Sequence, residues 1–513
     1  MPKVPLASPQ DCITPAFMGT GIGETFGATK YLWGNVPAFD VLELGSNEGE
    51  EYEGDLRILF AASGDLRNLI KTIANLPSSY NHLLEVTLND RDFDIVARNL
   101  ILLLVALVIG NSHEAVDCII HLWYSTLVRE SDIRILHDRI RPLIEDVCEK
   151  TKKKSPGTLL GKTWTFNHCS LRVVLEKSSW DRLLQIFNKP SGLTAEEALK
   201  IRAANTLAFS RRDYRDRYMS CLSPTERISF HKFRQDGLLL PFGFPRQDFR
   251  APNPTFFQTV DTWPMKDSAN PLDGWPLNEV LNTTSGAATA DTYGKLFFYL
   301  SDLLFSFLNR VSSSSISFRL LHLDASFLPG SLDTDSFCRI DVSNISDMGW
   351  LGIHRTLHLM IPLLQSPVQN PHATLITLFM NAVEESLTDD DRMLGLTPHS
   401  RATRDLLRYL PPKGARNSKY DPALIKFNIG RDLVTTYDHV FDRFLKDFEV
   451  HKAGHVFGAM IKEKHTIIEK WPYRLKLRPG QPGAQDEFDR CMRKSVSGKE
   501  RYVEWKKIHP GLL

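Results

Sequence analysis

DLRILFAASGDLRNLIKTIANLPSSYNHLLEVTLNDRDFDIVARNLILLLVAL, residues 55–107, decides the fold of this chain of 513 residues. The stretch alternates short apolar runs, typical of strands, with longer segments whose apolar residues recur at helical spacing. It predicts a strand, a turn at 63–65, a helix, a second strand that ends at Asp90, and a strongly apolar helix. Such an order predicts a parallel sheet with right-handed crossovers.

The ends of these two strands are candidate ligand-binding positions, because ligands of parallel sheets bind beyond the carboxyl ends of the strands. Gly64 has no side chain, so the backbone of the first turn is able to approach a ligand closely. Asp90 carries a carboxylate that is able to accept hydrogen bonds from the hydroxyls of a ribose. The two features predict a nucleoside-binding half of a Rossmann-like domain.

The alternation of strand and helix resumes after a long break. Residues 316–323 predict a strand that ends at Asp324, and residues 337–342 predict another, which a cluster of Ser, Asn and Asp follows. ATLITLFM, at 373–380, suits a central parallel strand because it is apolar throughout. The simplest fold is an α/β protein with one mostly parallel sheet that a large helical insertion interrupts. The expected parts are a leader (1–30), a Rossmann-like domain (31–110 and 311–385), a mostly helical insertion (111–310) and a mostly helical C-terminal region (386–513).

Three segments outside this core carry predictions of their own. Residues 249–275, rich in proline and aromatic residues, predict an ordered loop that lies across the sheet domain near the strand ends. TIIEKWPYRLKL, at 466–477, predicts a last edge strand, where a proline is permitted. The tail, residues 480–513, is polar and predicts helix or loose chain.

The composition bounds the class of protein. The chain is 42% hydrophobic and 24% charged, as in globular proteins, and its length suggests about two to four domains. A net charge of +1 gives no global field for nucleic acid or membrane. Seven scattered cysteines without CxxC favour free thiols in a reducing compartment. The longest apolar run, 100–109, is shorter than the roughly 20 residues of a membrane helix, and no secretory signal is evident. We therefore expect a cytoplasmic protein with neither nucleic acid nor membrane as a partner.

Motifs of several enzyme classes are absent from the sequence. There is no GxSxG, HExxH or Walker loop. GTGIGETFG, at 19–27, has no strand before it and no GK[ST] after it, so a surface leader is favoured over a phosphate loop. His451 and His455 lie four residues apart without a third ligand nearby, which favours a structural role. We expect no metal.

The plan of the sheet resembles a class I S-adenosylmethionine methyltransferase. The resemblance implies S-adenosylmethionine as a possible cofactor. It places the cofactor-binding contacts on the first turn and on the acids after the second and third strands, and the catalytic candidates beside the transferred methyl group. Phe60 stands near the position where that family carries an acid, and Ala62 near its first glycine. The implied cofactor contacts are Ser63, Gly64, Asp65, Asp90 and Asp324, and the catalytic candidates are Asn344 and Asp347.

A second resemblance rests on motifs spread over much of residues 31–385. WGNVPAFDVL, DLRILFAASGDLRNLIKTI, NDRDFDIVARNL, FRQDGLLLPFG, PNPTFFQ, DTYGKLF, IDVSNISDMGWLG and NPHATLITLFMNAV look like the fungal proteins of a domain family of unknown function. Some of those also carry a MYND zinc finger, whose clustered cysteines have no counterpart here. The N-terminal half of axonemal dynein assembly factor 3 shares the first part of the resemblance. The family implies no settled reaction.

Two functions remain open. The first is a degenerate or non-catalytic methyltransferase-fold protein that acts in protein interaction or complex assembly, with an unidentified protein partner. The second is an active S-adenosylmethionine-dependent methyltransferase of unknown substrate. The missing glycines favour the first, and the polar residues kept at several strand ends favour the second.

Overall fold

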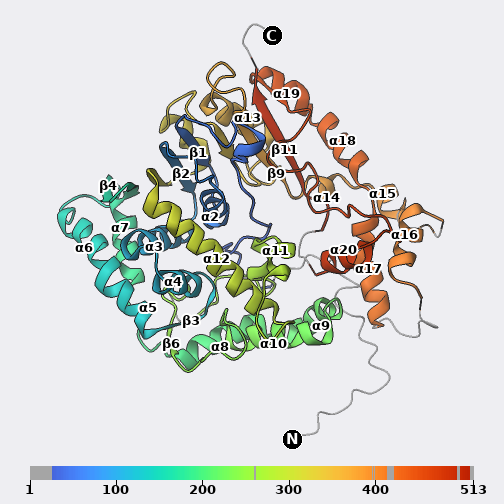
Figure 1. The fold of residues 1–513 in the computed structure, drawn as a ribbon, viewed down its shortest axis with the longest axis horizontal. Helices are drawn as coiled ribbons and strands as arrows, with labels where there is room; N and C mark the ends of the chain where they lie inside the picture. Colours follow the sequence, from blue (N-terminus) through green and yellow to red (C-terminus); the bar gives the residue numbers. More distant parts are fainter. Residues whose placement is uncertain are drawn as a thin grey trace, which may run out of the picture.

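The computed structural model describes residues 26–258, 261–394, 397, 399–412, 421–493 and 497–508. At its centre lies a nine-stranded sheet (Figure 1). Across the sheet the strands follow the order β10 (Ala459–Ile461), β11 (Arg501–Lys507), β9 (Thr374–Phe379), β8 (Arg339–Asp341), β1 (Leu56–Phe60), β2 (Leu84–Asp90), β7 (Ile316–His322), β5 (Cys169–Glu176) and β4 (Leu159–Phe166). Most of the predicted leader lies outside the described residues.

The five strands predicted from the sequence are neighbours in this sheet and run parallel. β1 pairs with β2 on one side and with β8 on the other, so that Ile58 lies opposite both Val86 and Arg339. β2 pairs in turn with β7, and β8 with β9. The prediction of one parallel sheet interrupted in the sequence is therefore confirmed for these strands.

Helices α2 (Arg67–Ala74), α3 (Phe93–Ile109) and α12 (Thr292–Ser313) cover one face of the sheet, and α4 (His113–Tyr124) packs on α3. α3 is strongly apolar, as the sequence predicts, and is buried along most of its length. Its start is fixed by Asp92, whose carboxylate accepts a hydrogen bond from the Asp94 N–H at 2.8 Å. The main hydrophobic core lies between these helices and the sheet.

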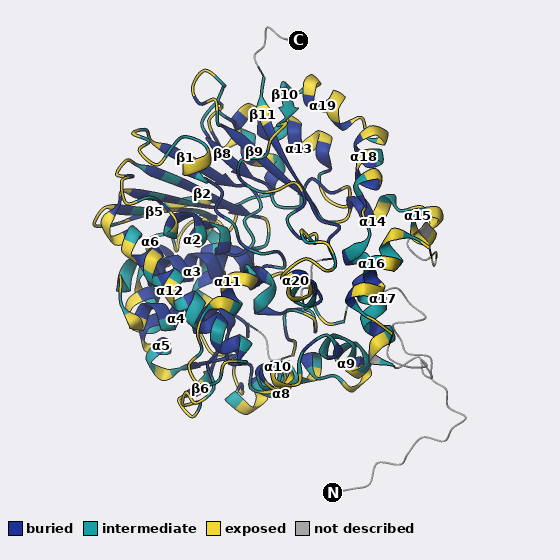
Figure 2. Cartoon of the chain, turned by 45° about the vertical axis from the view of Figure 1, so that its right-hand side comes forward, coloured by how far each residue is buried: buried dark blue, intermediate teal, exposed yellow. Residues whose placement is uncertain are grey.

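The second face of the sheet is covered only in part. A second core lies over β1, β8 and β9, under η5 (Ala325–Gly330), α13 (Ile353–Met360), η6 (Ile361–Leu363), α18 (Asp438–Asp447) and α19 (Val450–Val456). Figure 2 shows most of these strands as buried. On β7 and β5, by contrast, Ser317, Arg319 and Arg172 of this face are exposed or half-buried.

The insertion adds strands to the main sheet as well as helices. Its hairpin of β4 and β5 extends the sheet, because β5 pairs in parallel with β7. A separate small sheet joins β3 (Leu127–Arg129) to β6 (Phe249–Pro252). The remaining elements are α5 (Glu130–Ile135), the π-helical turn η2 (Leu136–Ile140), α6 (Arg141–Lys150), α7 (Lys177–Ile186), α8 (Ala195–Thr206), η3 (Phe209–Arg211), α9 (Arg212–Ser220), α10 (Pro224–Asp236), η4 (Pro271–Gly274) and α11 (Leu277–Asn282).

The loop at 249–275, described except for 259 and 260, is held by hydrogen bonds to the end of α4. The Asn253 Nδ2 donates to the carbonyls of His121, Leu122 and Ser125. The loop contacts the sheet domain through the segment 30–38, where the Ala38 N–H donates to the Gly274 carbonyl at 2.9 Å. Its large aromatic side chains are buried: Phe256, Phe257, Trp263 and Trp275.

The C-terminal region supplies two strands, and here two predictions are wrong. Residues 466–477 form no strand, because the N–H groups of 466–468 donate to the carboxylate of Glu504 instead of to a neighbouring strand. The tail is not only helix and loose chain: β11 pairs antiparallel with β9 and lies between β9 and β10. The region also holds α14 (Ala382–Ser386), α15 (Asp389–Leu394), α16 (Arg401–Tyr409), α17 (Pro422–Val434) and α20 (Ala484–Cys491); η1 (Leu44–Ser46) precedes β1.

Candidate functional site

The carboxyl ends of β1, β2, β7 and β8 carry most of the polar residues that the sequence singles out. Gly64, in the turn after β1, has a φ of 54°, in the left-handed region that glycine adopts at little cost. Among the described residues, no atom outside its immediate neighbours lies within 4 Å of the position of an added Cβ. The turn therefore faces open space.

Asp90 lies beside this turn. The Gly64 N–H donates to the Asp90 Oδ2 at 3.0 Å, and the Asp92 N–H donates to its Oδ1 at 2.9 Å. The residue is 8% exposed, and burial raises the pKa of its carboxyl above the ordinary value. Both oxygens of the predicted ribose acceptor thus have a partner within the protein.

Ser63 and two asparagines complete the link between the strand ends. The Ser63 N–H donates to the Asn89 carbonyl at 2.8 Å, and the Asn89 side chain joins the carbonyls of Ala61 and Leu323. The Asn99 Nδ2, from α3, donates to the Gly64 carbonyl at 2.7 Å. Sequence reasoning missed both asparagines. Asn89 immediately precedes the predicted acid, which is the signal that could have drawn attention to it.

Asp65 makes its contacts with α2 and with the segment before β1. Its carboxylate pairs with the Arg67 guanidinium and accepts a hydrogen bond from the Gly34 N–H at 2.8 Å. The Arg67 Nε donates to the Val36 carbonyl at 3.0 Å. Asp65 thus joins the segment before β1 to the start of α2.

Asp324 begins η5 after β7. Its Oδ1 accepts hydrogen bonds from the Ser326 N–H at 2.9 Å and from the Ser326 hydroxyl at 2.6 Å. The hydroxyl bond is the main reason that the pKa of Asp324 lies below its ordinary value, and the nearby charges of Arg91 and Arg355 lower it further. The residue acts as a helix cap at the edge of the site.

The loop after β8 holds both catalytic candidates, Asn344 and Asp347. The Asp347 carboxylate accepts hydrogen bonds from the Met380 N–H at 3.1 Å and the Asn381 N–H at 3.2 Å. The Asn344 side chain also bonds it. Burial, which is nearly complete at 1% exposure, raises the pKa of Asp347 to about 6. The two candidates therefore join the loop to the end of β9.

Asp341, at the end of β8, is an acid at a strand end that sequence reasoning did not select. Its Oδ1 accepts a hydrogen bond from the Ser343 N–H at 3.0 Å, and its Oδ2 accepts one from Asn68, on α2, at 3.1 Å. Burial raises its pKa. The signal that could have found it is its place at the end of an apolar strand, the same place that Asp90 has on β2.

A contact between two loops crosses the end of β1. The Arg91 guanidinium, after β2, lies 4.6 Å from the centre of the Trp350 ring, in the loop after β8. Because β1 lies between β8 and β2, this cation–π contact spans the strand whose turn contains Gly64.

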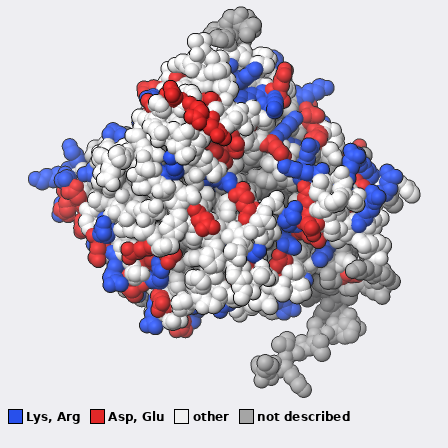
Figure 3. Space-filling view, viewed as in Figure 1, with Lys and Arg blue, Asp and Glu red and all other residues white. Residues whose placement is uncertain are grey.

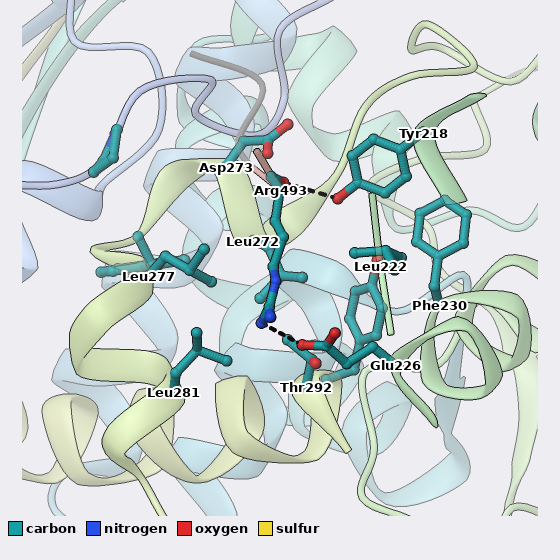
Figure 4. Close-up of a pocket in the computed structure, with 13 residues that line it drawn as sticks. Tyr218, Leu222, Glu226, Phe230, Leu272, Asp273, Leu277, Leu281, Thr292 and Arg493 are labelled. Atoms are coloured by element: carbon teal, nitrogen blue, oxygen red, sulfur yellow. Dashed lines mark hydrogen bonds and ion pairs between the residues drawn. The ribbon is translucent and has the colours of Figure 1, made fainter. Parts of the chain in front are cut away.

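A separate apolar pocket lies where the insertion meets the C-terminal region (Figure 4). The Arg493 side chain crosses it and pairs with Glu226, while the Tyr218 hydroxyl donates to the Arg493 carbonyl at 3.1 Å. The walls are mostly apolar, among them Leu222, Phe230, Leu272, Trp275, Leu277 and Leu281. None of the site residues predicted from the sequence lines this pocket.

Two features are absent from the part of the chain that the structure describes. No three side chains among its His, Cys, Asp and Glu residues are grouped so as to hold a metal ion. No helix in the described ranges is long and apolar enough to cross a membrane.

Comparisons with known proteins place one part of the chain in a family context. Residues 32–128 match the model of a domain of unknown function (DUF4470). The match runs from the segment before β1 to the start of β3, so it contains Gly64, Asp90 and Asn99 but not the strand ends beyond the insertion. Searches of curated proteins and of solved structures found no match.

Proposed function

We propose that this chain is a methyltransferase-like protein without catalytic activity that acts by binding protein partners. The order of the strands supports the first part. When the inserted hairpin is left out, β1, β2, β7, β8 and β9 are the first to the fifth parallel strands along the chain. Across the sheet they follow the order 3-2-1-4-5, as in doubly wound nucleotide-binding sheets. The last strand, β11, is antiparallel and lies between β9 and β10, an arrangement typical of class I methyltransferases.

The observation that carries the proposal is the bond between Gly64 and Asp90. In a cofactor site of this class, the acid after the second strand would accept hydrogen bonds from the ribose. Here its two oxygens accept from the backbone N–H groups of Gly64 and Asp92. A ribose would have to reach the remaining lone pairs of a carboxylate that is already nearly buried.

The other strand ends support the same reading. The carboxylates of Asp324, Asp341 and Asp347 each accept hydrogen bonds from nearby backbone N–H groups, so they hold turns in place. Phe60 occupies the end of the first strand, near the place of the acid that the resemblance implies. The contact between Arg91 and Trp350 also spans the turn that a cofactor would approach.

The alternative is an active S-adenosylmethionine-dependent methyltransferase, and one observation favours it. The space beside Gly64 is open, and its left-handed backbone would let a ligand approach the turn. In that case Ser63, Gly64, Asp90 and Asp324 would hold the cofactor. The resemblance of the sequence motifs to axonemal dynein assembly factor 3 favours the other reading, a role in assembling a protein complex.

Calorimetric titration of the full chain with S-adenosylmethionine and with S-adenosylhomocysteine tests the proposal. We expect no saturable heat at ligand concentrations up to about 1 mM, which corresponds to a binding free energy of about −4 kcal/mol. The matched variant is Asp90→Asn. Saturable binding to the wild type that this variant weakens at least tenfold would refute the proposal and establish cofactor binding at the end of β2.

A further inference from the structure

Three large apolar side chains beside the carboxyl edge are exposed to solvent. Phe327, in η5, is 66% exposed, and Met348 and Trp350, in the loop after β8, are 46% and 47% exposed. Scattered single apolar residues need no explanation, but a group of them marks a binding surface.

A ring contact, the packing of two elements and an electrostatic effect link the segments that carry these side chains to two arginines. Arg91 lies against the Trp350 ring. η5, which carries Phe327, packs against α13, which carries Arg355. Arg91 and Arg355 both lie close enough to Asp324, the cap of η5, to lower its pKa. We call Arg91, Phe327, Met348, Trp350 and Arg355 the arginine–aromatic surface.

The surface carries two positive charges, and Asp324 beside them carries one negative charge. Within the described part of the chain, neither Arg91 nor Arg355 forms an ion pair, and the Asp324 carboxylate accepts hydrogen bonds from Ser326. Both arginines are exposed. Their guanidinium groups are therefore available to carboxylates of another molecule, for which arginine offers two parallel donors.

The second face of the sheet extends the basic region. Arg319, on β7, donates to the Ser331 carbonyl at the end of η5, and Arg172 is exposed on the neighbouring β5. Sheets of parallel strands are normally covered on both faces, whereas here part of one face of β7 and β5 is open to solvent. A partner that covers part of this face would complete the usual arrangement.

We infer that the arginine–aromatic surface docks an acidic protein segment that carries an apolar anchor side chain. The inference deepens the proposed function and rests on it. Trp350 and the two arginines are of the residue types that contribute most to binding energy at protein interfaces. The apolar anchor would lie among Phe327, Met348 and Trp350, and flanking carboxylates would pair with Arg91 and Arg355.

A nucleic acid fits this surface less well. Phosphate backbones need a broad basic region, because binding depends on several neutralised phosphates. The net charge is only +1, and Figure 3 shows basic and acidic side chains interspersed over the face that it draws. The arginine–aromatic surface provides two cations next to apolar groups, which is the composition of a protein-binding site.

Selection from a random library of displayed 12-residue peptides against the full chain tests the inference. We expect the enriched peptides to carry net negative charge and at least one aromatic or leucine residue. Fluorescence anisotropy with a labelled enriched peptide should then give a Kd at least about tenfold higher for the double variant Arg91→Glu/Arg355→Glu, and likewise for Trp350→Ala, than for the wild type. The matched controls are Arg134→Glu, an exposed arginine on α5, and Val456→Ala, an exposed apolar residue on α19.

Several results would overturn the inference. The first is a set of enriched peptides without an acidic bias. The second is an affinity for the peptide that the surface variants leave unchanged. The third is a single-stranded oligothymidine that competes with the labelled peptide as well as the unlabelled peptide does. Thermal melting of each variant shows whether it is folded, and the milder Arg91→Gln/Arg355→Gln pair repeats the test if the charge reversals do not fold. Cofactor binding in the titration described above would refute the proposed function, whereas peptide binding at another surface would refute only this inference.

Discussion

The Gly64 N–H donates a hydrogen bond to the Asp90 Oδ2 at 3.0 Å, so the acid that ends β2 fixes the turn that follows β1. The bond is partly buried and joins two neighbouring strands at their carboxyl ends. Two residues that the sequence predicts as cofactor contacts thus also form an internal contact of the fold. Its first consequence is for stability.

Asp90→Ala should lower the free energy of unfolding by about 2 kcal/mol, because two partly buried N–H groups lose their carboxylate acceptor. Urea denaturation of both proteins at pH 7 measures the difference. Asp324→Ala is the matched control, because Asp324 also caps a turn but is less buried. It should cost about 1 kcal/mol. Equal losses of unfolding free energy for the two variants would show that the hydrogen bond to Gly64 stabilises the fold no more than an ordinary turn cap does.

Two glycine substitutions should differ in cost. Gly64→Ala puts a Cβ into open space, so only the left-handed backbone is strained, at about 1–2 kcal/mol. Gly34→Ala drives a Cβ into the buried guanidinium of Arg67 and disturbs its pair with Asp65, at about 3 kcal/mol or more. Thermal or urea unfolding ranks the two. The reverse order would mean that the turn at Gly64 is packed more tightly than its surroundings indicate.

Asp347 should make stability depend on pH. Burial raises its pKa from 3.8 to about 6 in the folded protein, so the folded chain binds this proton more tightly than the unfolded chain. The stabilising contribution of the protonated form is complete below about pH 3.8 and is lost as pH rises through 6.

Between pH 4 and pH 7, the wild type should therefore lose about 2 kcal/mol relative to Asp347→Asn, which cannot ionise there. Urea titrations at several pH values measure the difference between the two free energies of unfolding. Asp333→Asn, at an exposed position, serves as a control whose curve should run parallel to that of the wild type. A parallel curve for Asp347→Asn as well would contradict the prediction.

Arg493→Ala should loosen the C-terminal region locally without unfolding the chain. The side chain pairs with Glu226 across the pocket of Figure 4, and both partners are partly exposed, so the pair contributes at most about 1 kcal/mol. Hydrogen exchange should speed up in α20 and remain unchanged in β1 and β2. Lys476→Ala removes a more exposed pair with Glu469 and should have no such effect. Unchanged exchange in α20 would show that the apolar walls alone hold this junction.

The parallel core could be predicted because its strands are apolar and end in polar turns. Ile58, Val86 and Phe318 lie in strands that read plainly as buried segments, and the residues after them mark the carboxyl edge. What the sequence could not show is the role of each polar side chain there. A carboxylate after a strand is compatible with ribose binding and with capping a turn, and the hydrogen bonds that Asp90 and Asp347 accept from the backbone are seen only in the structure.

β11 could not be predicted for a different physical reason. Its residues Arg501 and Glu504 are completely buried, although charged side chains are rarely found inside a sheet. Glu504 is tolerated because the N–H groups of 466–468 and Lys462 surround its carboxylate. The sequence pattern therefore predicts a strand at 466–477, which donates these hydrogen bonds, and misses β11, whose Glu504 side chain accepts them.

The late position of β11 in the chain has a consequence for synthesis. β9 is buried throughout and mostly apolar, and its free edge is covered only when β11 pairs with it. A ribosome that adds about 5–20 residues per second needs roughly 6–26 s to go from the end of β9 to the end of β11. During that interval the nascent chain presents an unpaired, apolar strand edge, the kind of surface that recruits other strands. Production of this protein should therefore depend on chaperones that hold β9 until its partner emerges.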